Sequence, residues 1–241
     1  MTRGELYRAV GAFAAGLRRE GVRPGDRVAG YLPNLPEAII AALAAAAIGA
    51  VWSSSSPDFG AQGVLDRFGQ IAPKILVAAD GYSYGGKRHD CCPRIAEVVR
   101  ALPSIQRTVL VRYLKSGESA AIRDLVTWDD FLSPGAGSDP EFEPLPFNHP
   151  LYILYSSGTT GVPKCIVHGA GGTRIPQLKE HQLHCDIRAG DGIFYFTTCG
   201  WMMWNWQLSA LSLGVTLYLY DGNPGYPDVP ALWRLIEGGG R

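Results

Sequence analysis

The sequence predicts an α/β fold built from two layered α/β subdomains. Short apolar runs of strand length alternate with longer segments whose apolar residues recur at helical spacing. This alternation is typical of a mostly parallel sheet with buried strands. The pattern weakens from about residue 116 to 149 and resumes at Leu151. We therefore predict a first subdomain over residues 1–115, a connector over 116–150 and a second, incomplete subdomain over 151–241.

Each predicted element of the first subdomain follows from its apolar pattern. Leu6, Val10, Phe13 and Leu17 recur at helical spacing, and Pro36 stands near the first turn of the next helix, where proline is tolerated. The predicted helices span residues 4–22, 35–50, 58–72 and 92–102, and the predicted strands span 25–32, 74–79 and 107–113.

The second subdomain follows a stretch, residues 133–150, that is dense in glycine, proline and acidic residues and is typical of a connector. Two predicted strands, Leu151–Tyr155 and Cys165–Val167, flank a polar loop. Further helices are predicted over residues 173–187, 200–214 and 227–237, with strands over 192–197 and 215–220.

The composition excludes several classes of protein. Hydrophobic residues make up 46% of 241, which supports a substantial core, and 22 basic residues balance 22 acidic ones. A neutral chain has no broad basic surface for nucleic acid or anionic membranes, so we expect small-molecule partners. The longest apolar run, Ala38 to Trp52, is shorter than the ~20 residues of a membrane span and is typical of a buried helix. The five irregularly spaced cysteines and the absence of a signal-peptide pattern favour a reduced, cytoplasmic protein; the oligomeric state is left open.

The polar loop between the two strands reads YSSGTTGVPK, residues 155–164. A Walker loop needs Gly-Lys followed by Ser or Thr ahead of a helix, whereas here Val162 and Pro163 precede Lys164 and a strand follows. The composition nevertheless suits a phosphate cradle. Glycines expose backbone N–H groups, the hydroxyls add donors, and Lys164 adds a positive charge. The alternative is a flexible hairpin connection, although such connections usually take two to five residues.

This loop resembles the phosphate-binding signature of the acyl-adenylate-forming superfamily, with Cys165 in place of the usual last glycine. Residues 51–87, 166–172 and 178–206 are similar to the acetoacetyl-CoA synthetase family. The resemblance implies that acetoacetate, ATP and coenzyme A give acetoacetyl-CoA, AMP and diphosphate through an acyl-adenylate, with Mg²⁺ accompanying the ATP. It also implies that the loop holds the β- and γ-phosphates through Thr159, Thr160, Gly161 and Lys164, while Ser156, Ser157 and Gly158 shape it.

The resemblance implies two further contacts. Met202 and Met203, with Trp201 and Trp204 beside them, match positions that line the acyl pocket in related synthetases. A tightly packed core helix would show the same tryptophans and methionines. Lys87 and Arg88 match a basic loop that meets the phosphate of coenzyme A, and a solvated turn is the alternative.

A zinc site is the last candidate. His181 and His184 stand three residues apart on a predicted helix, with Cys185 next to them. No second ligand pair accompanies them, so we expect an ordinary polar helix face and no metal site.

The family's adenine-, ribose- and metal-binding segments and its lysine-bearing lid domain find no match in this sequence. We therefore expect an internal or truncated part of a longer enzyme, inactive alone. Two alternatives remain: a ligase for another short or branched carboxylic acid, and a non-catalytic phosphate-binding fragment.

Overall fold

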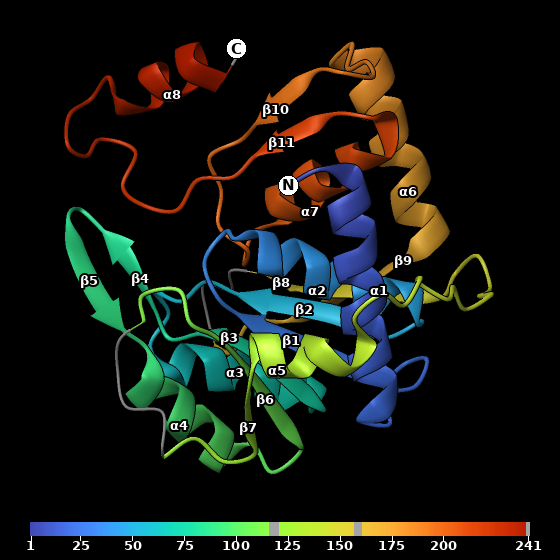
Figure 1. Cartoon of the computed structure of the whole chain (residues 1–241), viewed down its shortest axis with the longest axis vertical. Helices are drawn as coiled ribbons and strands as arrows, with labels where there is room; N and C mark the ends of the chain where they lie inside the picture. Colours follow the sequence, from blue (N-terminus) through green and yellow to red (C-terminus); the bar gives the residue numbers. More distant parts are fainter. Residues whose placement is uncertain (116–120, 157–160, 240–241) are drawn as a thin grey trace.

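The computed structural model describes residues 1–115, 121–156 and 161–239. Within them the largest sheet has seven strands in the order β7-β6-β3-β1-β2-β8-β9 (Figure 1). All neighbouring strands of this sheet run parallel except β9, which is antiparallel to β8. The predicted α/β class with a mostly parallel sheet is confirmed. The strands are β1 Arg27–Tyr31, β2 Val51–Ser55, β3 Ile75–Ala79, β6 Arg107–Val111, β7 Leu125–Thr127, β8 Pro150–Tyr155 and β9 Cys165–Gly169.

Helices cover both faces of this sheet. Alternate residues of β3 point to opposite sides: Ile75 and Val77 join one apolar cluster, whereas Leu76 joins the other. The first cluster is covered by α1 (Arg3–Arg19), α2 (Pro36–Ala47) and α5 (Trp128–Leu132), the second by α3 (Ala61–Ile71) and α4 (Cys92–Ala101). Helix α1 begins at a capping box, in which the hydroxyl of Thr2 accepts from the backbone N–H of Glu5.

The long apolar run from Ala38 divides into two elements. Helix α2 ends at Ala47, Gly49 adopts a left-handed φ of 73°, and β2 starts at Val51. Strand β2 is absent from the sequence-based prediction because its last three residues are serines, which carry no strand signal. Two of its three serine hydroxyls are satisfied in the interior: Ser53 donates to the carbonyl of Ile153 and Ser54 to that of Cys199. Oγ of Ser55 is buried without a hydrogen-bond partner among the described residues.

The strands around the polar loop belong to the large sheet. β8 pairs with β2 and β9 with β8, although the prediction placed these strands in a second subdomain. Pairing across the connector depends on contacts far apart in the sequence, which local patterns do not report. The division of the chain at residues 116 and 150 into folding units stays a prediction.

The remaining elements form a separate group above the large sheet (Figure 1). The elements are α6 Ala170–Lys179, a π-helix over Glu180–His184, β10 Gly192–Phe194, α7 Met202–Ser209, a 3₁₀-helix over Ala210–Leu213, β11 Thr216–Tyr218 and α8 Ala231–Gly239. β10 and β11 pair in parallel, and the hairpin of β4 (Gly81–Tyr84) and β5 (Lys87–Asp90) stands to one side. No helix in the described part of the chain is long and apolar enough to cross a membrane.

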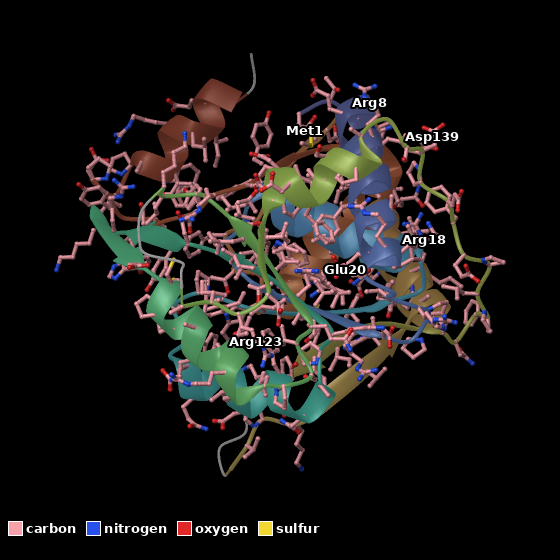
Figure 2. The ribbon with its side chains drawn as sticks, turned by 60° about the horizontal axis from the view of Figure 1, so that its bottom comes forward. Met1, Arg8, Arg18, Glu20, Arg123 and Asp139 are labelled. Carbon is pink, nitrogen blue, oxygen red and sulfur yellow. The ribbon has the colours of Figure 1, made fainter. Side chains whose placement is uncertain are left out.

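The connector lies along α1. Its first part contains β7 and α5, which were not predicted, and a 3₁₀-helix over Ser133–Gly135 follows. Beyond it, Arg18 donates to the carbonyl of Glu141 at 3.0 Å. A Cβ atom at Gly11 would lie 2.1 Å from the carbonyl oxygen of Ser138, so only glycine allows this approach. Figure 2 labels Asp139 of the connector beside α1, which carries Arg8 and Arg18.

Candidate active site

The polar loop leaves the carboxyl end of β8. β1, β2 and β8 are parallel, so their last residues, Tyr31, Ser55 and Tyr155, lie at the same edge of the sheet. In open α/β sheets, ligands bind in the crevice outside this edge. Of the seven predicted phosphate-binding residues, Ser156, Gly161 and Lys164 are described, whereas Ser157, Gly158, Thr159 and Thr160 lie outside the described residues.

The base of the loop is closed by hydrogen bonds between its two ends. The N–H of Ser156 donates to the carbonyl of Lys164 at 3.0 Å, and the N–H of Lys164 donates to Oγ of Ser156 at 3.3 Å. Gly161 has a φ of 104°, in the region that favours glycine. Lys164 is exposed, so its ammonium group is available to a ligand outside the sheet edge.

A cavity of about 450 Å³ opens at the same edge of the sheet. Its walls come from the segments after β1 and β2, from the β4–β5 hairpin, and from residues 196–198 and 220–222. This volume lies within the range of small-molecule sites. The cavity therefore lies between the edge of the large sheet and the segments that follow β10 and β11.

Asp221 is a half-buried acidic group of this cavity, and it was not among the predicted site residues. Burial raises the pKa of Asp221, while a hydrogen bond from Tyr113 acts in the opposite direction. Burial also raises the pKa of Tyr113, to about 12. Oδ2 of Asp221 is buried without a hydrogen-bond partner among the described residues. Its position directly after the predicted strand 215–220 is the signal that could have identified it.

The four predicted acyl-pocket residues have different environments. Trp201 and Met202 are 63% and 48% exposed at the start of α7, and Met203 is half-buried. Trp204 is 1% exposed, and its indole N–H donates to Oδ1 of Asn34 at 2.9 Å. Trp204 therefore belongs to the core, where its ring lies 6.4 Å from that of Trp52. An acyl-binding role stays a prediction for all four residues.

Lys87 and Arg88 are exposed on β5, after a turn formed by Gly85 and Gly86. Arg88 donates to the carbonyl of Leu114. Tyr82, Tyr84 and His89 of the same hairpin line the cavity. The two basic residues thus lie on an element that forms one wall of the cavity.

His181 is a core histidine. It is fully buried on the π-helix, lies 2.8 Å from Oγ of Ser209 through Nε2, and packs against Trp206 with a ring distance of 4.3 Å. Burial lowers the pKa of His181. His184 and Cys185 are exposed, so the three do not converge. Within residues 1–115, 121–156 and 161–239, no three His, Cys, Asp or Glu side chains are grouped to hold a metal ion.

Comparison with known proteins gives the family. A family model described as "AMP-binding enzyme" matches residues 1–239. The chain belongs to the AMP-binding enzyme family. This AMP-binding enzyme is 52% identical over 239 residues to the acetoacetyl-CoA synthetase of Mus musculus and 54% identical over 232 residues to the acetoacetyl-coenzyme A synthetase of Rhizobium meliloti.

A solved structure supports the same assignment. The acetoacetyl-CoA synthetase from Streptomyces lividans superposes on the AMP-binding enzyme described here with a TM-score of 0.92 and 48% identity, over 98% of this chain and 36% of that chain. The alignment with the mouse synthetase covers 97% of this chain and 36% of the mouse protein. The chain thus spans about a third of the length of these relatives.

Proposed function

We propose that the protein is an ATP-dependent ligase that joins acetoacetate to coenzyme A. In the first step a carboxylate oxygen of the acid attacks the α-phosphorus of ATP, and diphosphate leaves. In the second step the thiol sulfur attacks the acyl carbon, its proton is released and AMP leaves. The observation that carries the proposal is the identity of 52% and 54% to two proteins named as acetoacetyl-CoA synthetases.

The geometry of the loop supports ATP as the donor of the adenylyl group. Lys164 is exposed at the carboxyl edge of the sheet, and its backbone is fixed at the loop base by Ser156. A fixed cation that meets phosphate oxygens lowers the energy of a transition state in which charge moves onto the leaving diphosphate. We assign this role to Lys164, with the loop residues 156–161 supplying hydroxyl and backbone donors.

We assign the cavity next to this edge to coenzyme A. Lys87 and Arg88 stand on the hairpin that walls it and offer positive charge to phosphate groups. Phe196, Thr197 and Thr198 also line the cavity and stand shortly before the start of α7. A thiol that enters along this cavity would approach the acyl group held near Met202 and Met203.

Among the described residues no three acidic, histidine or cysteine side chains converge to hold a metal ion by themselves, and Mg²⁺ commonly binds through substrate phosphates with only one or two carboxylates. We therefore treat Mg²⁺ as the ion that accompanies ATP and derive no step through it. The location of the protein in the cytoplasm also stays a prediction from its sequence.

A second acid deserves testing because of one relative. The chain is 43% identical over 231 residues to a malonamoyl-CoA synthetase of Penicillium aethiopicum. Malonamate and acetoacetate differ only in an amino group in place of a methyl group, so a small change in the acyl pocket would exchange one for the other. A hydrogen-bond acceptor near that end favours the amide, whereas an apolar contact favours the methyl ketone.

An exchange assay separates these acids. Radioactive diphosphate is incubated with ATP and one acid at a time, using the protein at the length at which its host makes it. We expect exchange with acetoacetate to exceed that with malonamate, acetate and isobutyrate by about tenfold or more, the discrimination that a pocket gives for one small group. Faster exchange with malonamate would assign the second acid, and no exchange with any acid would contradict adenylation.

A further inference from the structure

Helix α3 contacts the phosphate loop from the neighbouring strand connection. The helix follows residues 56–58, which line the cavity. Its last turn, which carries Gln70, contacts the phosphate loop. The side-chain amide of Gln70 donates to the carbonyl of Pro163 at 2.8 Å. The same nitrogen donates to the carbonyl of Asp66 at 2.6 Å, which holds the side chain of Gln70 against its own helix.

These bonds hold the peptide group between Pro163 and Lys164 at both of its polar atoms. Its carbonyl oxygen accepts from Gln70, and its N–H donates to Oγ of Ser156. A peptide group is planar, so a partner on each side defines its orientation. The direction in which the Lys164 side chain leaves the backbone depends on that orientation.

Arg67, one turn earlier on α3, contacts the start of the loop. Its guanidinium carbon lies 4.2 Å from the ring centre of Phe59 and 5.8 Å from that of Tyr155, the last residue of β8. Both distances are within the range of cation–π contacts. The Tyr155 hydroxyl lies 2.9 Å from Oγ of Ser53, so this ring is held at its edge and at its face.

We propose that Gln70 and Arg67 are positioning residues for ATP: together they orient the two ends of the phosphate loop, and Gln70 sets the direction of Lys164. The inference rests on the proposed phosphate-binding role of the loop. Neither residue contacts a phosphate itself. Helix α3 thereby connects the loop with the segment 56–58 that lines the neighbouring cavity.

Gln62 provides a matched control for Gln70. Both glutamines are exposed on α3, but the amide of Gln62 donates to Asp66 of the same helix and to no loop residue that the structure describes. Gln70→Ala and Gln62→Ala therefore make the same chemical change in the same helix. Gln70→Met, which keeps the side-chain length and removes the donor, separates the hydrogen bond from packing.

The test is a titration of the protein, at the length at which its host makes it, with ATP, and separately with inorganic diphosphate, followed by ³¹P NMR. We expect Gln70→Ala and Gln70→Met to bind both ligands ~3- to 10-fold more weakly than the parent chain, the range of one hydrogen bond. Gln62→Ala should bind them as the parent does. Arg67→Met should weaken binding ~2- to 5-fold, as expected for a half-buried cation–π contact.

Melting temperatures and steady-state kinetics of the variants distinguish a positioning role of Gln70 from a merely structural one. The melting temperatures of Gln70→Ala and Gln62→Ala should agree, and at native length Gln70→Ala should lower kcat/KM for ATP while the KM for the acid is unchanged. Equal binding by Gln70→Ala and Gln62→Ala, with binding lost in Lys164→Ala, would overturn this inference and leave the proposed function standing. A parent chain that binds neither ligand would overturn both.

Discussion

At the scale of the single side chain, Lys164 of the phosphate loop and Trp204 of α7 have opposite environments. Lys164 is exposed next to a loop base held by hydrogen bonds, whereas Trp204 is 1% exposed and bonded to Asn34. An exposed cation costs little to remove from a fold, but a buried hydrogen-bonded indole costs much more. Substitution of Lys164 should therefore affect ligand binding, and substitution of Trp204 should affect stability.

For Lys164→Ala, we expect adenylation at native length to be slower by a factor of about ten to a thousand. The variant removes a charge aimed at phosphate oxygens in the transition state. Diphosphate exchange measures the effect, and Lys179→Ala, an exposed lysine on α6, is the control. Wild-type exchange in Lys164→Ala would show that another residue holds the phosphates.

Trp204→Phe should lower the free energy of unfolding by about 1–3 kcal/mol, because Oδ1 of Asn34 loses its donor in a buried site. Urea unfolding of the chain measures this difference. Trp233→Phe is the matched control, since Trp233 is 67% exposed on α8 and should change stability by less than about 0.5 kcal/mol. Similar losses for both variants would contradict the assignment of Trp204 to the core.

At the scale of the element, the π-helix holds α6 against α7. His181 contributes the contact, through Ser209 and the ring of Trp206, and both partners belong to α7. Nε2 of His181 meets Oγ of Ser209, whereas Nδ1 is buried without a partner among the described residues, so the second proton of a charged ring would have no acceptor. The helix that begins with Met202 and Met203 is therefore positioned by a neutral histidine.

This contact should make stability depend on pH. The pKa of His181 is lowered in the folded protein, so the unfolded chain takes up a proton first as the pH falls below about 6.5. Stability should be retained above that pH and decrease below it. Urea unfolding at pH 7.5 and 5.5 should show a smaller decrease in His181→Gln than in the parent. His184→Gln, an exposed histidine of the same π-helix, should behave as the parent, and equal decreases in all three proteins would count against His181.

At the scale of the whole molecule, the α/β core is well covered but the elements after residue 190 expose apolar surface. Val229 and Trp233 are 80% and 67% exposed, and a cavity of about 430 Å³ lined mainly by apolar residues lies beside α8. Exposed apolar patches of this kind promote association in water. We therefore expect the chain to associate through this region.

Size-exclusion chromatography with light scattering, at protein concentrations from about 5 to about 200 µM, tests this expectation. The apparent mass of the chain should rise with concentration, and Trp233→Glu should keep it closer to the mass of one chain. Phe142→Glu, which replaces a 68% exposed residue of the connector, should show the same rise in apparent mass as the parent chain. A monomer at every concentration would show that the exposed surface is too small to drive association.

The order of helices and strands could be predicted because it depends on local patterns. The helical spacing of Leu6 to Leu17 and the short apolar run at Ile75 correspond to α1 and β3. Strand β2 could not be predicted in the same way, since three consecutive serines resemble a loop until the acceptors of Ser53 on β8 and of Ser54 near α7 are known. The loop motif was visible in the sequence, and its role in binding ATP stays a prediction.

The sequence by itself determined the α/β class, the polar loop between two strands and the family resemblance, because each depends on residues that are neighbours along the chain. Only the tertiary structure decided that β8 and β9 join the large sheet, that Trp204 is a core residue, and that Gln70 contacts the loop from a helix 93 residues away in sequence. These features are contacts between distant segments. They form only when burial of the shared core brings those segments together, and no local periodicity encodes them.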